Sequence, residues 1–155
     1  MEITYSLCLP RDEVSVPIVR HLSREALIHL GVVESCVGDI ELALTEACTN
    51  VLKHARSEQE QYEVEVEVNF EFCVIRVIDT GGGFDSDAAR SVEQIPAAEG
   101  GRGIFLMSAL VDRLHFESKP EKGTVVHLEK RLALDDDSVL LRMRERQADS
   151  DAAAL

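Results

Sequence analysis

The chain has 155 residues, which is enough for one domain that buries a hydrophobic core without disulfides or bound metals. It carries 29 acidic and 16 basic residues, and the resulting formal net charge of −13 at pH 7 disfavours binding to nucleic acid or to an anionic membrane surface. Because the N-terminus lacks a basic, apolar leader and no apolar run approaches the ~20 residues of a membrane span, we expect a cytoplasmic protein.

The start of the chain predicts a strand and then a helix. The segment from Ile3 to Leu9 is rich in strand-forming residues and stops at Pro10, as is typical of an edge strand. A helix with apolar residues at helical spacing follows, and Gly31 ends it. These apolar residues are Val16, Val19, Leu22, Ala26, Leu27 and Leu30. The polar side of this helix carries Arg20, and the pattern alone predicts a solvated residue there.

A second helix is expected from about Ser35 to His54, with polar residues grouped on one side. Its apolar positions are Leu42, Leu44, Ala47, Val51 and Leu52. Glu46 and Asn50, followed by Lys53 or His54, lie three or four residues apart, so they stack on one face and can address one bound group. For Lys53 a surface position is equally expected, and for His54 a core or capping role is slightly preferred.

Two strands are expected next, and the second one leads into a glycine turn. The run from Tyr62 to Val68 alternates between apolar and acidic residues, which predicts a half-buried strand with an acidic, solvated face. Cys73 to Ile78 is nearly continuously apolar, which is typical of a central strand. Asp79 follows directly, with Gly81 and Gly83 behind it. Taken alone, this Asp-x-Gly pattern is more typical of an Asx turn than of a binding site.

A second glycine motif, Gly100-Gly101-Arg102-Gly103, runs into an apolar helix from Ile104 to about Leu110. Free backbone N–H groups and the positive end of the helix dipole make such a junction suitable for a phosphate group. Arg102 is equally expected to add positive charge there or to point outward. The preceding polar segment, Asp85 to Glu99, is long enough to predict a mobile lid.

The end of the chain predicts a hairpin and then a separate tail. Residues Arg113 to Phe116 and Thr124 to Leu132 are expected to pair around the turn at Pro120. From Asp135 onward the composition changes, and we expect a short helix from Val139 to Arg146 or a disordered segment. We therefore divide the chain into a domain of residues 1–134 and an acidic C-terminal extension of residues 135–155.

The cysteines and histidines form none of the spacings that are typical of metal sites or of hydrolases. The cysteines are Cys8, Cys36, Cys48 and Cys73, without a Cys-x-x-Cys pair. No Gly-x-Ser-x-Gly motif is present, and the histidines have no serine or carboxylate partner at a telling spacing. We therefore expect reduced thiols in apolar surroundings and no hydrolase triad.

The three polar motifs, in this order, resemble the histidine-kinase-like (GHKL) ATPase superfamily. Glu46 and Asn50 match its N box, Asp79, Gly81 and Gly83 its first glycine box, Gly100, Gly101 and Gly103 its second glycine box, and Thr124 its closing threonine. Arg102 departs from the apolar residue that many relatives carry. The small size and the Glu-Ala-Cys-Thr-Asn and Gly-Ile-Phe-Leu-Met segments are most similar to the bacterial anti-sigma-factor serine kinases.

The resemblance implies a Bergerat-type ATP-binding fold in residues 1–134. This fold is a two-layer α/β (α+β) sandwich, with helices on one face of a mixed, mostly antiparallel sheet. With the three motifs in register, we expect Asp79 to accept the adenine amino group of ATP. Magnesium prefers oxygen ligands and takes few of them from protein, so the amide oxygen of Asn50 is sufficient for Mg²⁺. Glu46, one turn earlier, is placed to act as a general base toward the γ-phosphate reaction.

The resemblance also implies protein partners. Anti-sigma kinases bind a sigma factor and phosphorylate a serine on a STAS-type anti-anti-sigma factor, and Arg20 is the best match to an arginine that engages partners. A homodimer is implied in the same way. A switch kinase of a stress-signalling complex fits the sequence equally well. The alternative from another class is an ATP-binding regulatory adaptor without phosphotransfer, against which Glu46 argues because pure binding needs no base.

Overall fold

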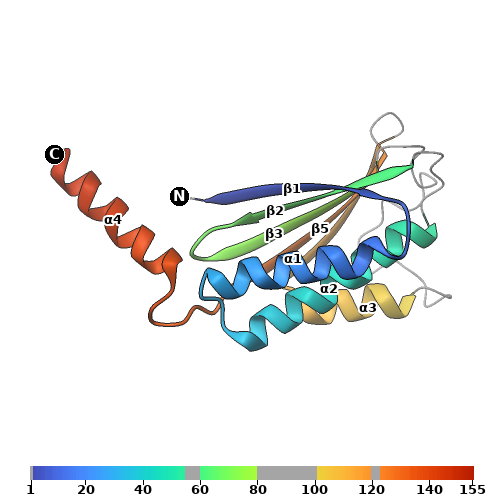
Figure 1. Ribbon diagram of the computed structural model, residues 1–155, viewed down its shortest axis with the longest axis horizontal. Coiled ribbons are helices and arrows are strands. Elements are labelled where there is room, and N and C mark those ends of the chain that lie inside the picture. The colour runs from blue at the N-terminus through green and yellow to red at the C-terminus, as the bar shows by residue number, and fades with distance from the viewer. Residues whose placement is uncertain (1, 55–59, 80–100, 120–122) are drawn as a thin grey trace.

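The computed structural model describes residues 2–54, 60–79, 101–119 and 123–155. In chain order the elements are β1 (Ile3–Pro10), α1 (Ser15–His29), α2 (Glu34–His54), β2 (Gln61–Val68), β3 (Phe72–Asp79), α3 (Gly101–Leu110), β4 (Arg113–Lys119), β5 (Gly123–Arg131) and α4 (Val139–Ala153). The strands form one sheet in the order β1-β2-β3-β5-β4, and α1, α2 and α3 cover one of its faces (Figure 1). The expected two-layer α+β fold is confirmed.

The sheet agrees with the strand pattern of the sequence and differs in one respect. β1 lies at an edge and β3 lies at the centre, as Pro10 and the apolar run of β3 predict. The alternation in β2 is confirmed, because its apolar side chains are buried and its glutamates are half-buried. All four pairings between the described strands are antiparallel, whereas the expected mixed sheet would also contain a parallel pair.

The core lies between the sheet and the helices. Its largest fully buried side chains include Leu27, Ile40, Leu44, Tyr62 and Met107. Two leucines of the expected apolar patterns do not belong to it: Leu22 on α1 is 45% exposed and Leu42 on α2 is 43% exposed. On α1 the buried position beside Leu22 is taken by Ser23, whose Oγ accepts a hydrogen bond from the Tyr5 hydroxyl at 3.3 Å.

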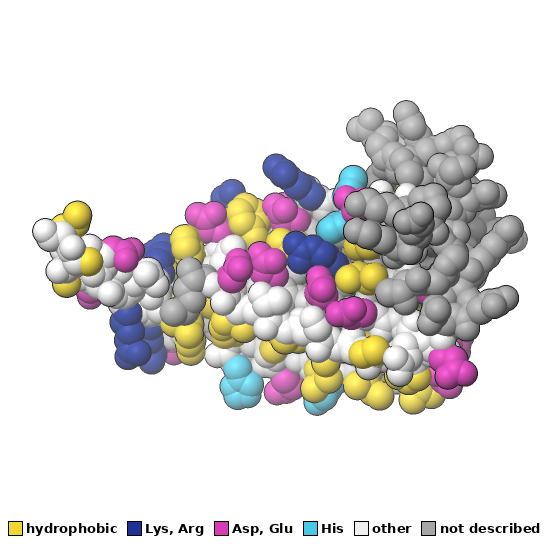
Figure 2. Space-filling model, turned by 90° about the horizontal axis from the view of Figure 1, so that it is seen from above, with side chains coloured by type: hydrophobic (Ala, Val, Ile, Leu, Met, Phe, Trp, Pro, Cys, Tyr) yellow, Lys and Arg dark blue, Asp and Glu magenta, His cyan; other side chains and the backbone are white. Residues whose placement is uncertain are grey.

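The sheet face opposite the helices is polar. One row across all five strands consists of Ser6, Glu65, Arg76, His127 and His115, which are neighbours in the strand registers. Figure 2 looks onto the molecule from above the sheet and shows acidic, basic and histidine side chains gathered there. Such a charged face remains in contact with water. A ligand that binds between the sheet and the helices would therefore use the opposite face of the sheet, which the helices cover.

Two histidines on this face do have a carboxylate partner, although the sequence spacing suggested none. His115 Nε2 lies 3.2 Å from one oxygen of Glu117, and His127 Nε2 lies 3.7 Å from the other. Partial burial lowers the pKa of His127, and this effect outweighs the opposing attraction of Glu117. His115 and Glu117 share a face of β4 because they are two residues apart, and the antiparallel pairing of β4 with β5 adds His127, which residue spacing does not reveal.

The C-terminal extension begins against the end of α1 and then leaves the body of the protein. Asp135 N donates to Gly31 O at 2.8 Å, and Ser138 Oγ donates to Leu30 O at 2.5 Å. Ser138 also caps α4 by accepting from Leu140 N. The helix runs to Ala153, beyond the short helix expected from the sequence, and projects away from the sheet (Figure 1). Among the helices of the described ranges, none has the length and apolar character needed to cross a membrane.

Candidate functional site

The central helix α2 presents the polar residues that its sequence spacing groups together. Its apolar face is fully buried against the sheet at positions such as Leu44, Ala47 and Val51. This packing fixes the rotation of the helix, so that Glu46 and Asn50 are left half-buried at its edge. Lys53, one turn further, is exposed. The side chain of His54 lies outside the described residues.

Glu46 faces the start of α3. A Cβ atom placed on Gly103 would lie 2.8 Å from Glu46 Oε2. The Cβ atoms of real side chains do not approach a neighbouring atom this closely. Only a glycine therefore allows the carboxylate to lie this close to the helix. A carboxylate is stabilised beside the first turn of a helix, where N–H groups are unpaired and the dipole is positive. The N box and the second glycine box thus meet at Glu46 and Gly103.

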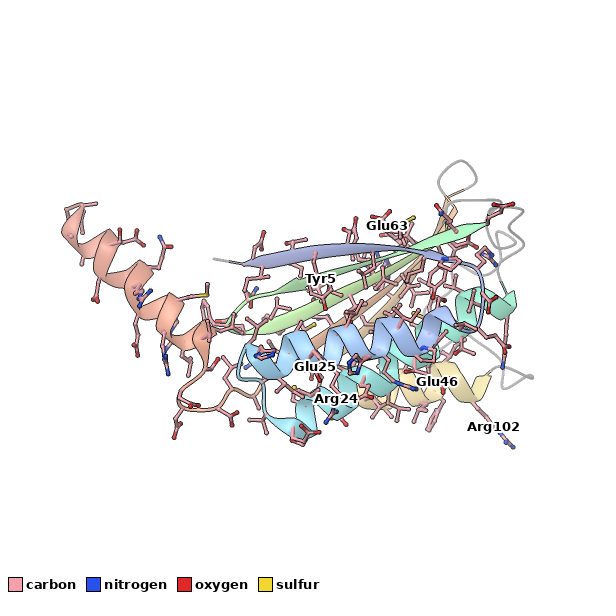
Figure 3. All side chains as sticks on the ribbon, viewed as in Figure 1. Tyr5, Arg24, Glu25, Glu46, Glu63 and Arg102 are labelled. Carbon is pink, nitrogen blue, oxygen red and sulfur yellow. The ribbon has the colours of Figure 1, made fainter. Side chains whose placement is uncertain are left out.

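Residues 101–103, the described part of the second glycine motif, are helical rather than part of a loop that precedes a helix. The sequence predicts that this helix begins at Ile104, but α3 begins at Gly101. Arg102 and Gly103 therefore belong to its first turn. Arg102 is exposed, and Figure 3 shows its side chain pointing away from the protein body, while Glu46 lies where α2 meets α3. The side chain of Arg102 therefore has the outward orientation, which is one of the two expected alternatives.

Asp79 ends the central strand β3 and is buried, with 2% of its surface exposed. Its register partner on β5 is Thr124, which is equally buried. Asp79 Oδ2 is paired with a cation, but Oδ1 has no hydrogen-bond partner among the described residues. A buried oxygen without a donor is costly in a folded protein, so this atom points to a ligand that donates a hydrogen bond.

The cation is Arg11, which the sequence analysis did not single out. Its Nη1 lies 2.8 Å from Asp79 Oδ2, and only 12% of the arginine side chain is exposed. Arg11 follows the edge strand directly, at a position where an arginine usually extends into water. Because its partner comes from the far end of another strand, no local pattern indicated the contact.

A buried hydroxyl and thiol network is close to the Arg11 side chain. The hydroxyls of Tyr62 and Ser15 lie 2.6 Å apart, and the Tyr62 hydroxyl also interacts with the thiol of Cys48. Burial raises the pKa of Cys48 to about 12 and that of Tyr62 to about 12. Both groups are therefore neutral at physiological pH, and Arg11 is the positive charge near this network that faces Asp79.

The remaining cysteines differ in burial. Burial raises the pKa of Cys73 to about 12, and Cys36 is also buried, whereas Cys8 is exposed. All four are free thiols.

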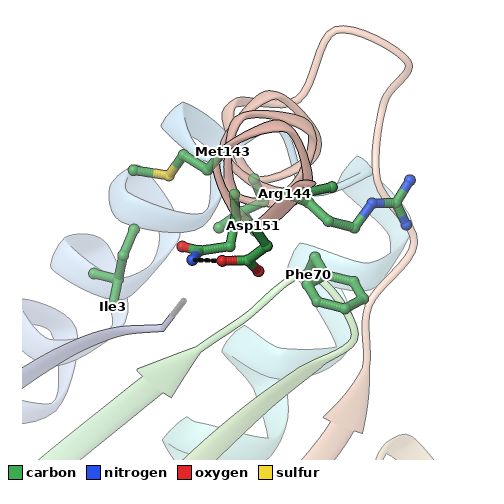
Figure 4. Close-up of a pocket in the computed structure, with 8 residues that line it drawn as sticks. Ile3, Phe70, Met143, Arg144 and Asp151 are labelled. Atoms are coloured by element: carbon green, nitrogen blue, oxygen red, sulfur yellow. Dashed lines mark hydrogen bonds between the residues drawn. The ribbon is translucent and has the colours of Figure 1, made fainter. Parts of the chain in front are cut away.

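Among the cavities of the described surface, one lies beside these residues and another lies against the C-terminal extension. A cavity of about 450 Å³ is lined by Arg11, Glu13, Val16, Pro17, Thr49, Leu52 and Lys53. The other, of about 190 Å³, lies between α4 and the start of β1, where Arg144 stacks on Phe70 (Figure 4). The second cavity is formed by the C-terminal extension and shares no residue with the predicted site.

Arg20 belongs to a charged cluster between α1 and α2. Its Nε lies 3.7 Å from Glu41 Oε1, while Arg24 contacts the other oxygen of Glu41 at 2.7 Å and also pairs with Glu34. The Arg20 side chain remains 42% exposed. The structure thus brings Arg20 close to a carboxylate but leaves part of its guanidinium accessible.

Several predicted site residues lie outside the described residues. These are Gly81, Gly83 and Gly100, together with the expected lid from Asp85 to Glu99. Within the described part, the residues present fit a bound adenine nucleotide, because Asp79 offers a buried acceptor and Asn50 a half-buried amide. No cluster of three or more His, Cys, Asp or Glu side chains suited to a metal is found in the ranges described.

The chain is similar to known proteins over most of its length. A family model for the histidine kinase-like ATPase domain matches residues 9–130. The chain is 32% identical over 141 residues to the serine-protein kinase RsbW of Halalkalibacterium halodurans, with 86% of each protein covered. It is also 32% identical over 104 residues to the anti-sigma F factor of Clostridium botulinum, with 61% of this chain and 71% of that protein covered.

A solved structure supports the fold independently. The RsbU and RsbW domains of a Mycobacterium tuberculosis protein superpose on this chain with a TM-score of 0.66 at 20% sequence identity. The match covers 88% of this chain and 34% of that one, so the present chain spans about a third of its length. At this identity the likeness establishes the fold alone.

Proposed function

The chain belongs to the histidine kinase-like ATPase family, within the group of anti-sigma-factor serine kinases, and from this premise we propose its reaction and partners. We propose an ATP-dependent anti-sigma factor that binds a sigma factor and phosphorylates a serine on a STAS-type anti-anti-sigma antagonist. The observation that carries the kinase proposal is the Glu46 carboxylate, which lies against the first turn of α3 beside Gly103. A protein that only bound ATP would not need a base there.

The nucleotide would lie between α2, α3 and the end of β3. Asp79 Oδ1 is the acceptor for the adenine amino group, and Thr124, its register partner, lies beside the base. Gly81 and Gly83 would allow the base to approach the backbone. The glycines of the second box, Gly100, Gly101 and Gly103, would place backbone N–H groups near the phosphates.

Charged and amide side chains of α2 complete the proposed site. Asn50 would hold Mg²⁺ through its amide oxygen, and the ion would neutralise charge on the phosphates. Lys53 is near enough along the helix to reach the same phosphates, and His54 is proposed as a further contact. Arg102 is proposed as a further phosphate contact, for which its side chain would turn from the outward direction that it has in the structure.

Phosphotransfer requires a serine hydroxyl to lose its proton as its oxygen attacks the γ-phosphorus. Glu46 would accept that proton, while the bond from the γ-phosphorus to the bridging oxygen breaks and ADP leaves. The half-buried position of Glu46 holds the carboxylate in place beside α3. Loss of general-base assistance reduces rates by ~10²–10⁴, so Glu46→Gln should bind ATP but transfer phosphate slowly.

The partner proposal rests on the surface around Arg20. Its exposed guanidinium would engage the sigma factor and the antagonist, and two copies of the chain would form a homodimer in the cytoplasm. Neither nucleic acid nor a membrane is a proposed partner, since the net charge is −13. The extension of residues 135–155 is proposed to lie outside the ATP-binding domain.

The test is capture of partners from the native lysate on the wild-type protein with Mg-ATP, followed by mass spectrometry that maps phosphoserine. Glu46→Gln serves as the matched control, because it keeps the size of the side chain and removes its charge. We expect a STAS-type partner that is phosphorylated by the wild type alone, together with a sigma factor. Partners that bind in a nucleotide-dependent way but are never phosphorylated would instead identify a regulatory adaptor.

A further inference from the structure

Arg11 and Asp79 form a buried ion pair at the end of the central strand β3. Nη1 of Arg11 lies 2.8 Å from Oδ2 of Asp79, and the two side chains are 12% and 2% exposed. A carboxylate at this depth is costly without a compensating charge. The guanidinium provides that charge and pairs with Oδ2. The other carboxylate oxygen, Oδ1, has no hydrogen-bond partner among the described residues.

The arginine is itself held in place from three sides. Its backbone N–H donates to Glu60 O at 2.8 Å, and Nη2 donates to Val51 O at 3.4 Å. The following turn is fixed by Asp12, whose Oδ1 accepts from Val14 N at 2.9 Å. Arg11 therefore links the start of β2, the last turn of α2 and the end of β3, and its guanidinium has little freedom to move.

Val51, which accepts from Arg11, is the residue directly after Asn50 on α2. One side chain thus contacts the helix next to the proposed magnesium ligand and also the carboxylate proposed for the base. This arrangement is not required to build the sheet, because the registers of β1, β2 and β3 are made by backbone pairing. It is well suited to fixing the orientation of the Asp79 carboxylate.

We propose that Arg11 is a positioning residue for nucleotide recognition. It fixes the charged carboxylate of Asp79 so that Oδ1 is presented as a hydrogen-bond acceptor, which selects a purine with an amino group at C6 and rejects one with a carbonyl there. An acceptor facing a carbonyl leaves two buried oxygens without a donor, and binding sites discriminate strongly against such pairs. This inference rests on the proposed ATP site and assigns its base selectivity to an ion pair.

The experiment measures the affinities of ATP and inosine triphosphate by calorimetry, for the wild type and for Arg11→Gln. Inosine triphosphate differs at C6, where a carbonyl replaces the amino group. We expect Arg11→Gln to weaken ATP binding by about 10-fold and inosine triphosphate binding much less, so that the ratio of the two affinities falls. Arg11→Lys keeps the positive charge and should retain most of the wild-type ratio.

Arg76→Gln is the matched control. Arg76 lies on β3, the strand that ends at Asp79, and it pairs with Glu65 and Glu67 on the sheet face that the helices do not cover. The Arg76→Gln variant should leave both affinities unchanged. An Arg11→Gln variant that keeps the wild-type ratio, or that weakens both nucleotides equally, would overturn the role of Arg11.

A double variant covers the case in which Arg11→Gln leaves Asp79 uncompensated and unfolds the protein. Asp79→Asn and Arg11→Gln/Asp79→Asn should show the same ratio of affinities, because Arg11 acts through the carboxylate. A further fall in the double variant would show that Arg11 acts independently and would overturn the inference. If Asp79→Asn binds ATP as tightly as the wild type, the proposed base site itself is wrong, whatever Arg11 does.

Discussion

The carboxylate of Glu46 occupies the space that a side chain on Gly103 would need, where α2 packs against α3. A Cβ on Gly103 would stand 2.8 Å from Oε2 of Glu46, so the position of the acid depends on the absence of a side chain on the neighbouring helix. Two residues from separate sequence motifs therefore constrain each other. Each motif alone predicts a local structure, and their contact creates the proposed catalytic geometry.

Gly103→Ala should therefore impair phosphotransfer without unfolding the protein. Alanine stabilises a helix by up to about 1 kcal/mol over glycine, but here its methyl group would displace the Glu46 carboxylate. A displacement of about 1 Å can reduce a rate by ~10²-fold, and ATP affinity should change little. Single-turnover phosphotransfer and calorimetric ATP binding measure the two effects separately.

Gly38→Ala is the control for that variant. Gly38 also lies in a helix, and a Cβ there would meet no atom within 4 Å. We expect an increase of roughly 0.5–1 kcal/mol in the free energy of unfolding and an unchanged rate. Equal loss of activity in the two alanine variants would contradict the proposed role of the contact with Glu46.

Arg20→Glu should weaken partner binding and spare nucleotide binding. The ion pair between Arg20 and Glu41 is long and half-exposed, and such pairs contribute only about 0–1 kcal/mol to stability. Reversing the charge at the proposed interface should reduce partner affinity by at least about 10-fold. Surface plasmon resonance with the purified partner measures this affinity, and the same charge reversal at the exposed Arg142 of α4 should have little effect. Loss of both ATP and partner binding in Arg20→Glu would indicate misfolding instead.

Gly31→Ala should destabilise the protein and loosen the C-terminal helix. Gly31 has a φ of +80°, and a Cβ there would lie 2.6 Å from the Cα of Ser138. Alanine is strained at such a φ, and the overlap with Ser138 adds to the cost, so we expect a loss on the order of 2 kcal/mol. Urea unfolding measures the loss, and faster proteolysis within α4 would show that the helix has lost its attachment. A variant as stable as the wild type would show that the backbone relaxes around the new methyl group.

The stability of the protein should fall steeply at alkaline pH. Burial raises the pKa of Cys48 and of Cys73 from 9.0 to about 12, and that of Tyr62 from 10.0 to about 12. The unfolded chain loses these protons first, so the stabilisation is complete below pH 9 and declines as the pH rises toward 12. The summed loss is on the order of 7 kcal/mol by pH 11, comparable with the whole stability of a small domain.

Urea unfolding between pH 8 and pH 11 tests this expectation. Cys73→Ala should make the decline shallower by about 1.4 kcal/mol per pH unit, since one titrating thiol is removed. At pH 8, only the exposed Cys8 should react rapidly with a thiol reagent in the folded protein. Rapid reaction of all four cysteines at that pH would contradict the burial on which the prediction depends.

The sequence by itself determined the elements of this protein and the grouping of residues within each one. Alternation between Tyr62 and Val68 defined a half-buried strand, and the spacing of Glu46 and Asn50 placed both residues on one side of α2. These features follow from side-chain periodicity, which depends only on neighbours along the chain. Asp79 was placed correctly at the end of a central strand for the same reason.

Only the tertiary structure decided which residues from different elements meet. The pairs of Arg11 with Asp79 and of Glu46 with Gly103 join segments that are distant in the sequence. The exposure of Leu22 and the burial of Ser23 depend on how α1 is rotated against the sheet. Such contacts are set by the packing of helices on strands and by the strand order, and neither of these is encoded in the spacing of residues along one element.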